Sequence, residues 1–219
     1  MSGMFRLGNL IALGVGLLIA TVNSSLALDS SDLEEVRDRA TFINEVRSIF
    51  QSGDETLQLT IFEKIITDGD PVILPMTLEL ALNSQDARLK TTALRYLINS
   101  RELLLVDLIR PDNSSQAQEF IYHEWRELVL QELKVAPATD EITGTFNSSK
   151  KRGEVIGQLT RGGVQLRLTD DFTVCSLRIL QVVGVDLNGV LDCAMRSHDA
   201  AENAANANEA QLPIRVRLS

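Results

Sequence analysis

The two cysteines of the chain, Cys175 and Cys193, are the residues with the clearest chemical potential, because a pair of thiols can form a disulfide. Both lie in the densest alternation of apolar and polar residues, the stretch from Gln158 to Cys193. Period-two alternation is typical of strands with one buried face. Cys175 shares its parity with Leu177, and Cys193 shares its parity with Leu191. We therefore predict a small β-module whose two cysteines form one disulfide.

The register of the predicted hairpin decides whether the two thiols can meet. The residue midway between Cys175 and Cys193 is Gly184, and a turn there places the cysteines directly opposite each other. A cross-strand pair has a Cα separation of about 5.5 Å, which a disulfide tolerates. The dipeptide Asn188-Gly189 is a competing turn signal. A turn there would place Cys193 opposite Gly184. The disulfide would then either join two sheets or not form, in which case both cysteines would be buried free thiols. We favour the turn at Gly184.

The two histidines offer weaker chemistry. Glu119, His123 and Glu127 are spaced by four on a predicted helix and would share one face, which could hold a divalent metal weakly. A fourth ligand and the HExxH pattern are both missing, so we interpret this face as solvated. His198 stands beside an aspartate in a stretch without apolar periodicity, and we interpret it as part of a surface pair.

Two acidic clusters resemble fragments of calcium loops. They are Asp68-Gly69-Asp70 and Asp170-Asp171, and neither is followed by an acidic residue at the spacing that a calcium loop requires. We predict that both are turns. None of the serines lies in a GxSxG elbow. The sequence therefore leads us to assign no catalytic, cofactor-binding or metal-ligating residue, and we expect a protein that is not an enzyme.

The elements around the cysteines predict an antiparallel β-structure. Val164, Leu166 and Leu168 alternate with polar residues after a Gly-Gly turn, and a last strand is predicted over Leu212–Leu218. We expect this β-domain to occupy residues 141–219 as a small antiparallel sandwich or barrel with one disulfide. Residues 196–211 are rich in Ala and Asn and predict a loop.

Residues 1–27 have the pattern of a secretory signal peptide. Arg6 precedes an apolar run from Leu10 to Val22, and Ser25-Leu26-Ala27 fits the small-x-small cleavage pattern. The run is too short to span a bilayer comfortably. We expect cleavage before Leu28, a periplasmic or secreted protein with no membrane insertion after cleavage, and an oxidising compartment that supports the disulfide.

Charge is divided unevenly along the chain. Residues 28–140 carry 11 basic and 21 acidic side chains, whereas residues 141–219 carry 9 of each. A strongly acidic surface disfavours binding to nucleic acid and to anionic membranes. We therefore expect no nucleic-acid partner.

Helical periodicity dominates the acidic part. Helices are predicted over residues 29–51, from Asp54, over Pro71–Asn83, from Asp86, over Glu102–Ile109, and from Ser114 or Ser115 to Lys134. The segment that starts at Asp54 is similar to the one that starts at Asp86, 32 residues later, and each starts with an Asp as N-cap. Over residues 54–110 the chain resembles HEAT-type α-helical repeats. The resemblance implies an α-solenoid whose surface binds proteins.

These patterns predict an α+β protein with two domains, an acidic helical domain over residues 28–135 and the β-domain, joined by a Pro- and Ala-containing linker at residues 136–140. We expect an exported, non-enzymatic interaction protein in which the helical arm and the β-module each offer a surface to a protein partner. The alternative is an enzyme-associated role, either a hydrolase with a scattered site or an enzyme inhibitor.

Overall fold

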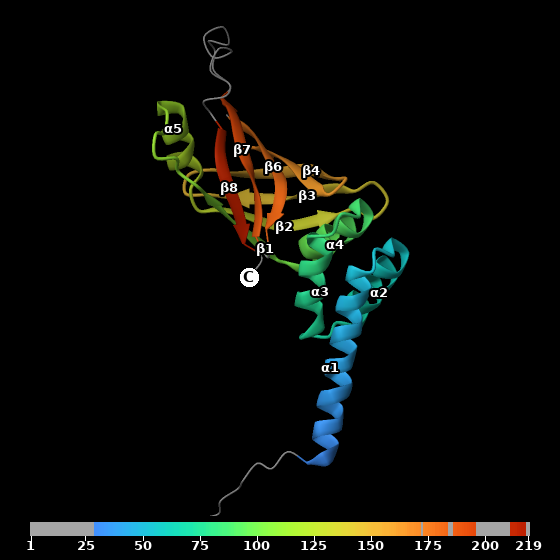
Figure 1. Cartoon of the computed structure of the whole chain (residues 1–219). Coiled ribbons are helices and arrows are strands. Elements are labelled where there is room, and N and C mark those ends of the chain that lie inside the picture. The colour runs from blue at the N-terminus through green and yellow to red at the C-terminus, as the bar shows by residue number, and fades with distance from the viewer. Residues whose placement is uncertain (1–28, 172, 184–185, 196–210, 218–219) are drawn as a thin grey trace, which may run out of the picture. The chain divides into compact units, whose positions relative to one another are not determined.

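Eight antiparallel strands close into one barrel, in which each strand pairs with the next along the chain and β8 pairs with β1 (Figure 1). The computed structural model describes residues 29–171, 173–183, 186–195 and 211–217. The predictions for residues 1–27, Gly184 and residues 196–210, which include His198, fall outside the described residues. The strands are β1 (Leu103–Leu108), β2 (Leu128–Val135), β3 (Glu141–Asn147), β4 (Arg152–Thr160), β5 (Gly163–Thr169), β6 (Thr173–Val183), β7 (Asp186–Met195) and β8 (Gln211–Arg217).

Five helices accompany the barrel: α1 (Ser30–Gln51), α2 (Glu55–Asp68), α3 (Ile73–Leu82), α4 (Ala87–Ser100) and α5 (Gln116–Trp125). The N-caps predicted for α2 and α4 are confirmed. An Asp54 carboxylate oxygen accepts the Leu57 amide at 3.0 Å, and an Asp86 oxygen accepts the Arg88 amide at 2.9 Å. Side-chain caps of this kind satisfy amides that have no partner inside the helix.

The second helix of the second repeat unit is absent. Residues predicted as a helix over Glu102–Ile109 form strand β1, so only the first of the two predicted repeat units is a pair of helices, α2 and α3. The segment Leu-Leu-Leu-Val-Asp-Leu is apolar at both parities, a pattern that fits either a helix segment or a strand with apolar side chains on both faces. In the barrel, Leu104 and Val106 point inward, while Leu103 and Leu105 point outward. The resemblance to HEAT-type repeats stays a prediction.

The long helix predicted up to Lys134 ends at Trp125. Its start is confirmed, because Ser115 and Gln118 form a reciprocal capping box. The remainder forms β2, which contains a bulge between Gln131 and Lys134. A bulge shifts side-chain parity by one, so residues three apart face the same side, as they do in a helix. This shift explains the error in the sequence-based prediction.

Residues 136–140 connect β2 to β3 and are not a domain linker. The Ala136 amide donates to the Glu141 carbonyl at 2.8 Å, and the Asp140 amide donates to the Ala136 carbonyl at 3.0 Å. Strands β1 and β2, which the sequence assigned to the helical domain, are part of the barrel. The predicted border near residues 136–140 therefore lies inside the barrel.

The chain divides into two compact units, Met1–Ala40 and Thr41–Ser219. Within the second unit, helices and barrel share one buried apolar cluster that runs from Phe62 and Leu94 to the inward side chains of every strand. Helix α4 contacts β2, β4 and β5 at one end of the barrel. Asn99 and Arg95 of this helix bond to the backbone of Val135 and to the Asp140 carboxylate, respectively. We call this end of the barrel the α4 end.

The opposite end of the barrel is covered by α5. The Trp125 indole stacks on the Phe146 ring with the ring centroids 5.1 Å apart. The β3–β4 turn bonds to the last turn of α5, since the Ser148 hydroxyl donates to the Glu124 carbonyl at 3.1 Å. Most inward-facing apolar side chains of the strands are buried, and Leu108 and Val182 near the barrel ends are partly buried. An eight-stranded barrel is just wide enough for its own side chains to fill it.

The predicted disulfide is present between Cys175 and Cys193, in the register expected for a turn near Gly184. Cys175 of β6 pairs directly with Cys193 of β7, and the hairpin closes with the pair Val183 and Asp186. The fold class predicted from the sequence, α+β with a small antiparallel barrel and one disulfide, is confirmed.

The competing turn at Asn188-Gly189 is wrong, because both residues lie inside β7. Gly189 is needed there for a different reason. A Cβ atom on Gly189 would lie 2.0 Å from the carbonyl oxygen of Arg178 on β6. The glycine therefore permits a close approach of two strands beside the bulge in their ladder.

We expect Gly189→Ala to lower the free energy of unfolding by about 1–3 kcal/mol, because the two strands must separate to admit the methyl group. Asn188→Ala at the neighbouring position is the control and should stay within about 0.5 kcal/mol. Urea unfolding followed by circular dichroism measures both values. Equal midpoints for the two variants would contradict the close approach.

Candidate functional site

The outer side of β1 carries two leucines that are about half exposed at adjacent outward positions. Leu103 and Leu105 are 49% and 50% exposed, and they flank the partly buried Val129 of β2. Outward positions on the other strands are mainly polar, and the exposed aliphatic residues there are Ile156 of β4 and Leu180 and Val183 of β6. We call Leu103, Leu105 and Val129 the β1 face. Contiguous exposed apolar side chains are typical of interaction surfaces.

A groove with a volume of about 820 Å³ lies beside the β1 face. One wall is β1 from Leu105 to Ile109, and the other is formed by Tyr122 of α5 and the start of β2. A second groove of about 780 Å³ runs over Leu103, Gln131 and Lys134 towards the end of α4. The exposed leucines therefore stand between two hollows on the same side of the barrel.

The charged residues that line the first groove are three arginines, Arg126, Arg215 and Arg217, and two acidic residues, Asp107 and Glu127. Arg217 Nε lies 2.7 Å from an Asp107 oxygen, and Arg215 Nε lies 3.6 Å from an Asp186 oxygen. Arg126, also in the lining, forms no ion pair with any residue that the structure describes. Asp186 lies outside the lining and offsets Arg215, so the charges in and beside the groove balance.

The groove forms because β2 begins only at Leu128, so the part of β1 beyond Val106 is not paired with β2. The Arg126 amide donates to the Tyr122 carbonyl at 3.0 Å, and the Arg126 carbonyl accepts the Ser149 amide at 2.9 Å. The next residue, Glu127, has φ of 60°, a left-handed conformation that is uncommon for a residue other than glycine. These contacts and this turn direct the chain away from β1 until Leu128, where the β1–β2 ladder begins.

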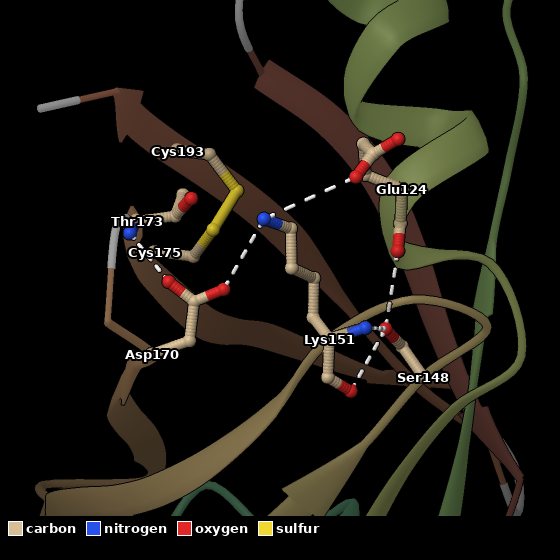
Figure 2. Close-up of a disulfide and its surroundings, with 7 residues drawn as sticks. All are labelled: Glu124, Ser148, Lys151, Asp170, Thr173, Cys175 and Cys193. Atoms are coloured by element: carbon tan, nitrogen blue, oxygen red, sulfur yellow. Dashed lines mark hydrogen bonds and ion pairs between the residues drawn. A yellow bond between two sulfur atoms is a disulfide. The ribbon is translucent and has the colours of Figure 1, made fainter. Parts of the chain in front are cut away.

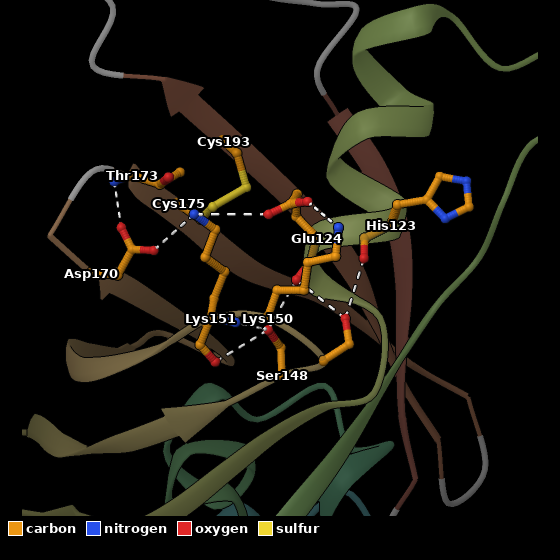
Figure 3. A network of polar contacts seen from close by, with 10 residues as sticks. His123, Glu124, Ser148, Lys150, Lys151, Asp170, Thr173, Cys175 and Cys193 are labelled. Carbon is orange, nitrogen blue, oxygen red and sulfur yellow. Dashed lines mark hydrogen bonds and ion pairs between the residues drawn. A yellow bond between two sulfur atoms is a disulfide. The ribbon is translucent and has the colours of Figure 1, made fainter.

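A network of charged side chains surrounds the disulfide at the end of the barrel that α5 covers (Figure 2). Lys151 Nζ lies 3.3 Å from an Asp170 oxygen and 3.9 Å from a Glu124 oxygen. Their side chains are only 18%, 7% and 17% exposed, respectively. Figures 2 and 3 both show the Lys151 ammonium group beside the disulfide and between the two carboxylates.

The remaining contacts of this network link the end of α5 to the β3–β4 turn and stabilise the β5–β6 turn. Lys150 Nζ lies 2.7 Å from the second Glu124 oxygen, and the Thr173 amide donates to Asp170 at 2.5 Å (Figure 3). The Ser148 hydroxyl donates to a backbone carbonyl and does not contact a side chain that could act as its base. The network therefore joins α5 to the β3–β4 and β5–β6 turns, and its chemistry is that of ion pairing.

The predicted face of Glu119, His123 and Glu127 is not assembled. His123 Nε2 lies 3.8 Å from a Glu119 oxygen, but Glu127 lies beyond the end of α5. The other Glu119 oxygen is 2.6 Å from Arg110 Nε. Among the residues described, no group of three or more His, Cys, Asp or Glu side chains could hold a metal ion.

Both acidic clusters are turns, as the sequence predicted. Gly69 ends α2 in the left-handed conformation, and an Asp70 oxygen accepts the amides of Val72 and Ile73 at 2.8 and 3.1 Å. Asp170 accepts the Thr173 amide in the β5–β6 turn. The Asp70 and Asp170 carboxylates therefore stabilise local backbone geometry.

The helices offer a smaller hollow of about 290 Å³ between α3 and α4, lined by residues that include Leu74, Leu78 and Tyr96. In the part of the chain that the structure describes, no helix combines the length and the apolar character required to cross a bilayer. The residues that the sequence-based analysis missed are Leu103, Leu105 and Arg126. The signal that could have found the leucines is an apolar run at both parities that is too short for a typical helix.

Comparison of the chain with protein-family models, with curated proteins and with solved structures gives no match in any of the three searches.

Proposed function

We propose that this protein is an exported, non-enzymatic binding protein of the periplasm or the cell exterior, and that it recognises a partner protein through the β1 face. The observation that carries the proposal is the exposure of Leu103 and Leu105 between two grooves. Half-exposed leucines at adjacent outward positions of one strand leave apolar area in water, which a partner can cover.

Two further observations support this function. The barrel interior is occupied by the protein's own aliphatic side chains, so a ligand has more room outside the barrel than inside it. The disulfide agrees with an oxidising compartment such as the periplasm or the cell exterior, because cytosolic thiols are normally kept reduced. The hollow between α3 and α4 is smaller, and its lining residues Leu74 and Leu78 are only partly exposed, whereas Leu103 and Leu105 are about half exposed.

We expect Leu105→Arg to weaken partner binding at least tenfold, because a charged side chain would occupy the centre of an apolar contact. The matched control is Ile156→Arg, since Ile156 is a 58% exposed aliphatic residue on the outer side of β4. Both replaced side chains are exposed, so the two variants should melt at the temperature of the unaltered protein.

The measurement is capture of partners from the envelope fraction of the source cells by each purified protein, followed by titration of the captured partner. Selective loss of binding in Leu105→Arg supports the function. Equal binding by both variants, or turnover of a generic ester, peptide or glycan by the pure protein without a captured partner, would contradict it and favour the enzyme-associated alternative.

A further inference from the structure

Strand β1 has an open edge inside the groove. Its ladder with β2 ends at the pair Val106 and Leu128, whereas its ladder with β8 continues to Leu108 and Ile214. Beyond Val106, no strand in the described ranges lies on the β2 side of β1. Unpaired strand edges are templates for the addition of another strand.

Backbone geometry shows which groups face this opening. The Ile109 amide donates to the Pro213 carbonyl of β8 at 2.8 Å. Successive residues of an antiparallel strand direct their amides to alternate sides. The amide and carbonyl of Leu108 therefore point away from β8 and into the groove, where an extended chain could bond to both.

The opening is fixed by the folded chain. Arg126 is held by backbone bonds to Tyr122 and Ser149, and the left-handed turn at Glu127 follows it. Because these contacts direct the start of β2 away from β1, the protein does not close the edge with its own backbone. The edge and the exposed Leu105 lie in the same groove.

The charges of the groove favour a partner with carboxylates. Arg217 and Arg215 already face Asp107 and Asp186, but the Arg126 guanidinium has no ionic partner within the described segments. With Asp186 included the charges around the groove balance, so Arg126 is the guanidinium that a carboxylate of the partner can pair with. Complementary charge of this kind steers binding and rejects partners of the wrong sign.

We propose that the groove binds an extended segment of the partner protein that carries carboxylate side chains, and that this segment adds a short strand at Leu108. The inference rests on the proposed function, since both use the β1 side of the barrel. Main-chain hydrogen bonds to Leu108 hold the segment, and alternate side chains contact Leu105 and Arg126. Strand addition of this kind obtains affinity from the backbone and specificity from the side chains.

The test uses a fluorescent peptide with the sequence Ser-Glu-Val-Thr-Val-Glu-Ser and the whole exported protein. We expect saturable binding, and at least tenfold weaker binding of the same peptide with Lys in place of Glu. N-methylation of the central Thr should weaken binding to a similar extent, because it removes a backbone donor. Exchange of the Leu108 amide with solvent should slow when the peptide is bound.

Arg126→Glu should weaken binding of the acidic peptide at least tenfold. The matched control is Arg167→Glu, which makes the same charge change at an exposed outward position of β5, far from β1 in the strand order. We expect this control to bind within twofold of the unaltered protein.

Equal binding of the acidic and basic peptides, or unchanged exchange at Leu108 in the saturated complex, would overturn the proposal. If neither peptide binds while partner capture still depends on Leu105, strand addition is wrong and the proposed function stands. Concentration-dependent self-association that Arg126→Glu abolishes, without peptide binding, would show that the occupant is a second copy of this chain and would also overturn the proposal.

Discussion

Replacing Leu94 by Asp is expected to lower the free energy of unfolding by about 4 kcal/mol or more, because the substitution places an unpaired carboxylate in a buried apolar site. Leu94 is fully buried on α4, in the cluster that α4 shares with the barrel. Domains are typically stable by only about 5–15 kcal/mol. A loss of this size would remove a large fraction of the stability and clearly lower the urea midpoint.

The matched control is Leu57→Asp on α2, which makes the same chemical change at a leucine that is 43% exposed. We expect a change of less than about 1 kcal/mol there, because the carboxylate can remain in water. Urea unfolding followed by circular dichroism and by Trp125 fluorescence measures both variants. Similar midpoints for Leu94→Asp and Leu57→Asp would mean that α4 does not pack as described.

Arg95→Asp is expected to have an intermediate effect. From the sequence alone, Arg95 lies just off the apolar face, and its replacement should resemble a surface change. The structure shows that Arg95 pairs with Asp140 in the β2–β3 turn. An aspartate at this position would face Asp140 with like charge, so the cost should exceed that at Leu57 but remain below that at Leu94.

The sequence predicts the later strands well because each carries its own alternation. Leu212, Ile214 and Val216 of β8 all point inward, as the apolar period requires. The two Asp caps predict the starts of α2 and α4 for a similar reason, since capping depends on residues within one turn. Local signals of this kind need no knowledge of distant contacts.

The first two strands could not be recognised by the same method. Strand β1 is apolar on both sides, and β2 has a bulge that imitates helical spacing. What makes β1 a strand is its pairing with β8, for example Val106 with Val216, more than one hundred residues away. Periodicity within a window contains no information about a partner at that distance, so the pairing of β1 with β8 was not predictable.

The candidate site could not be recognised from the sequence, because residues 102–109 were predicted to form a helix. In a predicted helix, Leu103 and Leu105 would be assigned to an apolar face that packs against the neighbouring helix. Only the barrel shows that these side chains point away from the core and that β2 leaves part of β1 uncovered. The cysteine pair, by contrast, was predictable, because it depends on the register of a single hairpin.

Loss of the disulfide between Cys175 and Cys193 is the second large effect that we expect. The two cysteines are separated by 18 residues, and closing a loop of this length stabilises a protein by about 3 kcal/mol in the chain-entropy model. Both cysteines are buried in the barrel interior, at 0% and 6% exposure. Reduction should therefore be slow in the folded protein and fast in urea, because the reductant must reach a buried bond.

The position of the bond determines which part of the protein responds. The predicted division into two domains implies that reduction acts on the β-domain alone, since residues 28–135 contain no cysteine. In the structure, the cysteines belong to the same apolar cluster as Phe62 and Leu94 of the helices. Strands and helices should therefore lose stability together, in one transition at a lower urea concentration.

Thiol labelling of the purified protein under denaturing, non-reducing conditions comes first, and we expect it to find no free thiol. Urea unfolding with and without reductant then gives the loss of stability, followed by circular dichroism for the helices and by the single tryptophan, Trp125, for the barrel. The control is the double variant Cys175→Ala and Cys193→Ala, whose unfolding should not respond to reductant. Labelling of two thiols per chain would show that the disulfide is absent. Separate transitions for the two signals after reduction would instead mean that the helices and the barrel do not act as one cooperative unit.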